Sequence, residues 1–153
     1  MREGRRVIGE TTLTGTELAS VQHNPQRNAS VLDSIAVGYY PMDLHACREP
    51  LETAFDTPKN LDQQISGRPF EVPIRVLIPE KVDGLLAVEK NISVSRQANG
   101  AIREQPIAMA IGQAAGALAA LSALHHEQPR DVPYKQLQQV LLTYGAVVTV
   151  SYK

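Results

Sequence analysis

The feature that most constrains the fold is an uncharged apolar run in the second half of the chain. Between Pro106 and Leu124 the only polar side chains are Gln113 and Ser122, and alanine and glycine supply most of the other positions. A run of this length can cross a lipid bilayer as a helix. It contains few large apolar side chains, however, and no aromatic or basic belt lies on both sides of it. We therefore expect a helix placed between two layers of a globular protein.

This helix has two unlike faces and an unusual start. At about 3.6 residues per turn, one face carries bulky side chains and the opposite face small ones. A glycine in a helix interior costs about 1 kcal/mol relative to alanine, so we expect another backbone close to the small face. Pro106 suits a first turn, but Gln105 is a weak N-cap. The free N–H groups are satisfied either by water and a nearby loop or by an anionic or electron-rich ligand. The bulky face holds Ile107, Ile111, Leu118 and Leu121, and the small face holds Ala108, Gly112, Gly116, Ala119 and Ala123.

The rest of the chain predicts short strands and two further helices. Thr14 and Glu17 have the spacing of a capping box, so a short helix is expected to run to about residue 21. A later helix is expected between Pro133, in its first turn, and Gly145, which stops it. Turn-rich residues predict a loop at 22–30, and prolines without periodicity predict a surface excursion at 46–70, near a ligand site. The expected strands are 5–13, 34–40, 70–78, 84–89 (buried on both faces) and 146–152.

Composition excludes several classes of function. Acidic and basic side chains nearly cancel, 16 against 15, so we expect no nucleic-acid partner and no membrane partner. Cys47 is the only cysteine, which excludes an internal disulfide framework and a cysteine-rich zinc site, and we expect no metal. No apolar segment follows the basic residues at the start, so we expect no signal peptide. The localisation is left open.

Five segments of the chain occur in an order that resembles the C-terminal part of a family of FAD-dependent oxidoreductases. The resemblance runs from residue 2 to about residue 148 and is most specific from Val72 to Leu121. The segments are REGRRVIGE, DSIAVGYYPMDLH, VPIRVLIPEKVDGLLAVEKNIS, ANGAIREQP and AMAIGQAAGALAAL.

The resemblance implies a mixed α/β (α+β) fold, as the C-terminal portion of a two-domain FAD-binding flavoprotein. Residues 1–80 are then the substrate-domain-like part, and residues 81–153 return to the FAD-binding part. No G-x-G-x-x-G opens a βαβ unit in the sequence, so FAD is expected in the full-length parent and not in this chain alone. The implied partners are the N-terminal dinucleotide-binding part of the parent and a small-molecule or carbohydrate substrate.

The resemblance also implies the residues of the site. Arg5, His45 and Arg103 are candidates for orienting substrate or handling a proton. The alternative is that the two arginines pair with Glu3 and Glu104 or with solvent, and that His45 is a surface loop histidine. Many members read Gly-Arg where this chain has Glu89-Lys90, and many have serine in place of Gly4, which changes individual contacts. The cofactor-binding candidates are Glu89, Lys90, Ser93, Asn99, Gly100, Pro106, Met109 and Gln113.

Three functions remain open at this point. The first is hydride transfer between an organic substrate and flavin. The second is a polysaccharide lyase of the xanthan type, for which Tyr39, Tyr40, His45 and Arg48 offer a base and a partner for an acid. The third is an inert folded fragment without a ligand. Because exposed apolar faces favour association, we also expect a homo-oligomer that buries the helix at 106–124 or the strand at 84–89.

Overall fold

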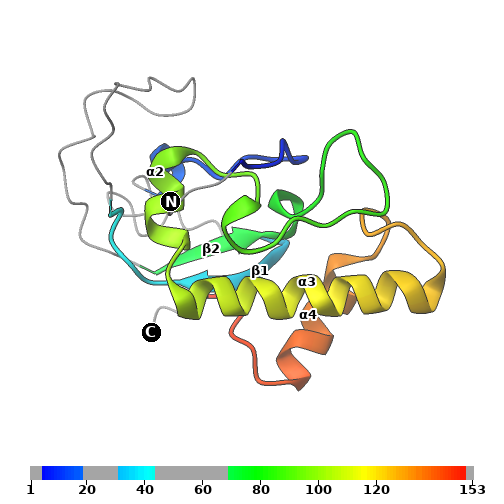
Figure 1. Ribbon diagram of the computed structural model, residues 1–153. Helices are drawn as coiled ribbons and strands as arrows, with labels where there is room; N and C mark the ends of the chain where they lie inside the picture. Colours follow the sequence, from blue (N-terminus) through cyan, green and yellow to red (C-terminus); the bar gives the residue numbers. More distant parts are fainter. Residues whose placement is uncertain (1–4, 19–30, 44–68, 151–153) are drawn as a thin grey trace.

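The computed structural model describes residues 5–18, 31–43 and 69–150. Around the long helix α3 (Gln105–His125) these residues form one hydrophobic core, to which both halves of the chain contribute. The two-stranded sheet of β1 (Ser34–Gly38) and β2 (Phe70–Pro73) packs against α3, and α4 (Tyr134–Thr143) also packs against α3 (Figure 1). The shorter elements are η3 (Ile74–Val76), η4 (Glu89–Asn91) and α2 (Arg96–Ile102). Several predictions lie outside the described residues, namely the loop at 22–30, the excursion over 46–68, and the side chains of His45, Cys47 and Arg48.

The sheet confirms two of the predicted strands in part. β1 pairs antiparallel with β2, with Ala36 opposite Val72 and Gly38 opposite Phe70. The strand expected at 70–78 ends at Pro73, where the chain continues into the 3₁₀ turn η3. Proline has no N–H to extend a ladder, which explains why the apolar run does not continue as a strand.

The predicted strand at 5–13 is wrong, although this segment is held by backbone hydrogen bonds. The N–H of Val7 donates to the carbonyl of Asn91 (3.0 Å), whereas the N–H of Glu10 donates to the carbonyl of Ile78 (2.9 Å). Near the end of the segment 5–13, Leu13 forms an isolated parallel β-bridge with Val94. Because the segment changes partner along its length, no continuous ladder forms.

Two further strand predictions are also wrong among the described residues. At 84–89 the structure has no strand, and Leu85 and Val88 are 49% and 40% exposed instead of buried. Residues 146–150 form no strand either, and 151–153 lie outside the described part. Residues 149 and 150 are instead bound by the carboxylate of Glu71, which accepts hydrogen bonds from Thr149 Oγ1 (2.7 Å) and Val150 N (2.8 Å).

The helix predictions are confirmed where the structure describes them. The capping box is present, because Glu17 Oε2 accepts from Thr14 N (2.7 Å) and Thr14 Oγ1 accepts from Glu17 N (3.2 Å). Its helix covers residues 15–18, and the predicted end lies beyond the described residues. Pro133 precedes the first residue of α4, and Gly145 follows the helix with φ 78°.

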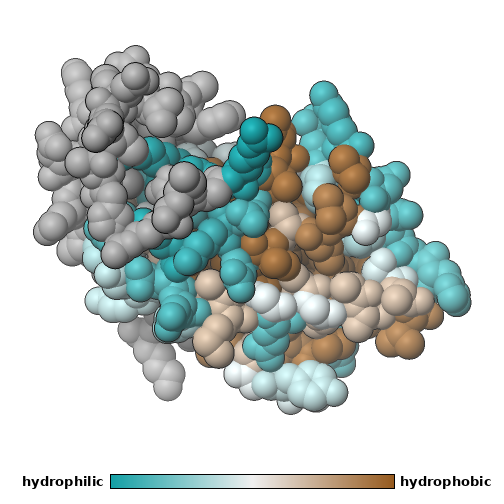
Figure 2. Space-filling model, in the orientation of Figure 1, coloured by the Kyte–Doolittle hydropathy of each residue, from teal (hydrophilic) through white to brown (hydrophobic). Residues whose placement is uncertain are grey.

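The two faces of α3 have different surroundings. Its bulky face is buried, as predicted, but the small face is open at its glycines: apart from the helix's own backbone, no atom of the described residues lies within 4 Å of a Cβ built on Gly112 or Gly116. In Figure 2, apolar surface runs along α3 and over the chain beside it. Within the described part of the chain, α3 is the one helix long and apolar enough to span a membrane, and 33% of its most apolar stretch is buried. Core helices pass the same test, so length and composition do not place it in a bilayer.

Candidate functional site

The residues suggested as cofactor ligands lie mainly on three neighbouring elements. η4 packs against both α2 and α3, so the end of the 84–88 segment and the helix pair share one region. Glu89 and Lys90 are exposed on η4, whereas Pro106, Met109 and Gln113 are exposed on α3. These five side chains are accessible to a ligand, and Met109 is the most prominent of the apolar ones at 74% exposure.

Ser93 is buried and has a structural partner. Its hydroxyl lies 2.8 Å from Thr12 Oγ1, and its N–H donates to the carbonyl of Val76 (2.9 Å). A Cβ on Gly9 would lie 2.8 Å from the Ser93 Cβ, so the two segments are in close contact here. In this arrangement Ser93 joins the N-terminal segment to the core.

Asn99 is the most unusual polar residue of the region. It lies in α2 with 1% of its surface exposed, and neither Oδ1 nor Nδ2 has a hydrogen-bond partner among the residues that the structure describes. Leaving a buried amide unsatisfied costs about 1–3 kcal/mol per lost partner. The next residue, Gly100, is in close contact with the backbone of Asp43: an added Cβ would lie 2.6 Å from the Asp43 carbonyl oxygen.

Arg103 is anchored on Asp43. Its Nη2 donates to the Asp43 carbonyl (3.1 Å) and to Oδ2 (2.8 Å), and the side chains are 5% and 43% exposed. The partner is therefore Asp43 and not Glu104. Arg5 is exposed, while His45 and Glu3 lie outside the described residues. Of the two catalytic candidates that the structure describes, Arg103 has a partner within the protein, Asp43.

The N-cap residue of α3 does not cap the helix with its own side chain. Glu104 occupies the N-cap position and makes no capping hydrogen bond, and the first bond inside the helix runs from Ala108 N to Glu104 O (2.9 Å). The N–H groups of Gln105 and Ile107 precede that bond, and Pro106 has none to offer. The positive end of the helix dipole therefore lies where Pro106 and Met109 are exposed.

Glu89 has a backbone conformation that its side chain disfavours. Its φ is 55°, in the left-handed region, which costs a residue with a Cβ about 1–2 kcal/mol. Sequence reasoning missed this strain. The available signal was the glycine that many resembling sequences carry at this position.

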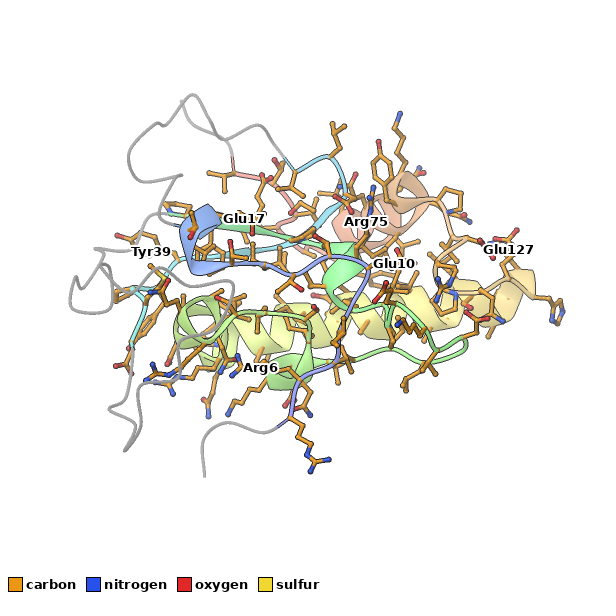
Figure 3. All side chains as sticks on the ribbon, turned by 90° about the horizontal axis from the view of Figure 1, so that it is seen from above. Arg6, Glu10, Glu17, Tyr39, Arg75 and Glu127 are labelled. Carbon is orange, nitrogen blue, oxygen red and sulfur yellow. The ribbon has the colours of Figure 1, made fainter. Side chains whose placement is uncertain are left out.

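A hollow that sequence reasoning also missed lies near the C-terminal end of α3. It has a volume of about 500 Å³ and is lined by Leu86, Ala119, Ser122, Ala123 and neighbouring residues. The hollow is far from Tyr39, which was considered as a lyase residue. Glu127, which lines the hollow, and Tyr39 lie at opposite ends of the molecule (Figure 3).

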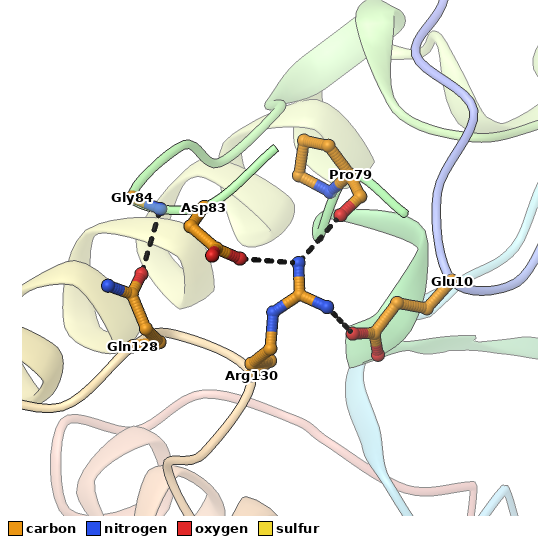
Figure 4. A network of polar contacts seen from close by, with 6 residues as sticks. All are labelled: Glu10, Pro79, Asp83, Gly84, Gln128 and Arg130. Carbon is orange, nitrogen blue, oxygen red and sulfur yellow. Dashed lines mark hydrogen bonds and ion pairs between the residues drawn. The ribbon is translucent and has the colours of Figure 1, made fainter. Parts of the chain in front are cut away.

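Beside this hollow, the guanidinium of Arg130 joins its own segment to the N-terminal segment and to the turn at 79–83. Arg130 binds Glu10 Oε1 (3.1 Å), Asp83 Oδ1 (3.1 Å) and the Pro79 carbonyl (3.0 Å), as Figure 4 shows. The hydrogen bonds and ion pairs drawn there join parts of the fold to one another. The described residues also contain no group of three or more His, Cys, Asp or Glu side chains that could hold a metal ion.

Helices with a small two-stranded sheet form a mixed α+β fold, which is consistent with a fragment of an FAD-binding domain. The family model described as FAD dependent oxidoreductase matches residues 1–141. The chain therefore belongs to the FAD dependent oxidoreductase family. No curated protein and no solved structure matches the chain. The family assignment supports a flavin-dependent oxidoreductase and gives no support to a polysaccharide lyase.

Proposed function

We propose that this chain supplies the flavin-facing part of an FAD-dependent oxidoreductase that takes hydride from an organic substrate. One observation carries the proposal: the N-cap residue of α3, Glu104, makes no capping hydrogen bond, and Pro106 and Met109 in the following turn are exposed, on a helix that packs against η4. A helix N-terminus in this position favours negative charge on a bound group.

The exposed residues suit the ring and sugar-alcohol parts of FAD. Met109 and the flat surface at Gly112 offer an apolar area for a ring, and the Gln113 amide can donate and accept hydrogen bonds. On η4, the Glu89 carboxylate can accept from hydroxyl groups, and Lys90 can meet a phosphate. Bound FAD would supply the hydride acceptor, while the protein orients the reacting groups and excludes water.

The pyrophosphate is the part of FAD for which this chain offers least. No G-x-G-x-x-G is present in the sequence, and such a loop supplies the backbone N–H groups that bind the phosphates. We therefore propose that a dinucleotide-binding part of the parent completes the site. In this proposal residues 81–153 return to that part, residues 1–80 belong to the substrate side, and the chain alone binds FAD weakly or not at all.

The catalytic candidates take different roles in this proposal. Arg103 acts as a positioning residue, because its side chain is buried and holds Asp43 through two hydrogen bonds. Arg5 is exposed and could meet a carboxylate or hydroxyl of the substrate. His45 keeps its suggested part in proton handling, since it follows Asp43 by two positions. The substrate class, a small molecule or a carbohydrate, is part of the same proposal.

The test starts from protein purified from its natural source, whose absorption spectrum is recorded for the visible band of oxidised flavin. Candidate alcohols, hydroxy acids and oligosaccharides are then added without oxygen. We expect the flavin band to be present and to bleach with one of them. A colourless protein that releases unsaturated sugars would overturn the proposal in favour of a lyase.

A second arm uses the recombinant chain of 153 residues and FAD. Fluorescence titration should detect weak binding or none, because the phosphate-binding loop is absent. Tight binding of one FAD per chain would show that these residues form a complete site by themselves, and the proposed need for a dinucleotide-binding part would be wrong.

A further inference from the structure

The backbone at Glu89 is strained, and hydrogen bonds on both sides fix it there. With φ 55°, Glu89 has the left-handed conformation that residues with a Cβ disfavour. Before it, the N–H of Ala87 donates to the carbonyl of Leu77 (2.8 Å). After it, the carbonyl of Asn91 accepts from the N–H of Val7 (3.0 Å). The surrounding structure thus holds a conformation that glutamate disfavours.

Neither the side chain nor the helix pattern gives a structural reason for this strain. Glu89 is exposed, and its carboxylate is in none of the hydrogen bonds or ion pairs of the described residues. His126 is the other non-glycine residue of the described part with a positive φ, and it has a local reason because it ends α3. Glu89 instead begins η4. Strain that the surroundings impose without a local reason is typical of functional positions, so Glu89 is a candidate for a role in the reaction.

We propose that Glu89 lowers the reduction potential of the bound flavin. This inference rests on the proposed function, in which η4 and the exposed residues of α3 face the cofactor. One hydride carries two electrons and one proton from a substrate C–H bond to the flavin, whose charge becomes more negative by one, and a hydroxyl or amine proton of the substrate leaves to water. The Glu89 carboxylate opposes the added negative charge, so it makes the flavin a weaker oxidant.

The charged groups of this region have both signs. Lys90 is exposed beside Glu89 on η4, and the N-terminal end of the α3 dipole favours negative charge on a bound group. Glu104, the N-cap residue of α3, carries a second carboxylate and is half-buried. Of these three side chains, Glu89 is the one whose backbone is strained. Its direction is therefore held at a cost to stability, and we expect its charge to be the one that the site uses.

The experiment measures the midpoint reduction potential of the full-length parent with its flavin bound, against a reference dye. Glu89→Gln keeps the size of the side chain and the strained Cβ but removes the charge. The equilibrium between oxidised and reduced flavin should move toward the reduced form by about fivefold, which is about 20 mV more positive for a two-electron couple. Glu89→Asp retains the charge and should stay close to the wild-type potential.

Glu127→Gln is the matched control, because it removes the same charge from an exposed side chain at the hollow near the C-terminal end of α3. Its potential should equal that of the wild type. Salt screens exposed charges, so the difference between Glu89→Gln and the wild type should shrink as the salt concentration is raised. A difference caused by altered packing would not respond to salt in this way.

The possible failures separate this inference from the proposed function. Flavin-containing wild-type and Glu89→Gln proteins with the same potential would overturn the role of Glu89 and leave the proposed function intact. An equal shift in Glu127→Gln would also overturn it, because the effect would then be one of net charge. Loss of flavin from Glu89→Gln would show a binding role in its place. A wild-type parent without flavin would overturn both.

Discussion

Replacing Glu89 by glycine should stabilise the protein, although glycine usually weakens a fold. Glu89 has φ 55°, and its exposed side chain is in none of the hydrogen bonds or ion pairs of the described residues. The left-handed conformation costs a residue with a Cβ about 1–2 kcal/mol, and glycine does not bear this cost. The greater freedom of glycine in the unfolded chain offsets about 0.4–1 kcal/mol of the gain.

With the middle of each range, the net effect is a rise in the free energy of unfolding of about 0.8 kcal/mol. For a chain of this size, 1 kcal/mol corresponds to a change in Tm of about 2–4 °C, so we expect an increase of about 1–4 °C. Glu89→Ala is the control, because it removes the carboxylate but keeps a Cβ in the same strained conformation. Alanine should therefore give little or no increase.

The assay is thermal unfolding followed by circular dichroism, with urea unfolding as an independent measure of the free energy. Wild type, Glu89→Gly and Glu89→Ala are compared at one low concentration, so that association does not contribute. If glycine gives the same Tm as alanine or a lower one, the backbone at residue 89 is not strained. The reading of this position as a site of stored strain would then have to be given up.

Four further substitutions test the packing in the same unfolding assays. Gly100→Ala should lower the free energy of unfolding by about 1–3 kcal/mol, because its Cβ would lie 2.6 Å from the carbonyl oxygen of Asp43. Gly112→Ala should instead raise it by up to about 1 kcal/mol, because the added methyl group meets no atom within 4 Å; a loss here would mean that the face is covered. His126→Gly should raise Tm by a few degrees, since His126 follows α3 with φ 55°. Arg103→Met should cost about 1–3 kcal/mol, less than the loss of a fully buried pair, because Asp43 is 43% exposed; no change in urea would show that the pair contributes nothing.

The sequence was sufficient for features whose cause is local. The period of the apolar residues predicted α3 and its two faces, and the spacing of Thr14 and Glu17 predicted the capping box. Gly145 was recognisable as a helix stop because the left-handed conformation after a helix favours glycine. Each of these signals needs only residues within a few turns of one another.

Features that depend on distant partners could not be predicted. The apolar run at 84–89 has the composition of a strand, but a strand also needs a continuous ladder, and none forms there among the described residues, although Ala87 N–H donates to the Leu77 carbonyl (2.8 Å). Segment 5–13 has neighbours that change along its length, which no local pattern encodes. The pairing of Arg103 with Asp43 joins residues 60 positions apart, and the unsatisfied amide of Asn99 has no sequence signature at all.

The contacts of Arg130 have a consequence for the order of folding. This side chain joins Glu10, 120 residues away in sequence, to the turn at Pro79 and Asp83. Closing so long a loop costs entropy before any contact compensates for it, so such contacts form late. We therefore expect α3 and α4 to form early and the N-terminal segment to dock last. The amide hydrogens of that segment, including the one on Glu10, should then be the first of the bonded ones to exchange with solvent in the native state.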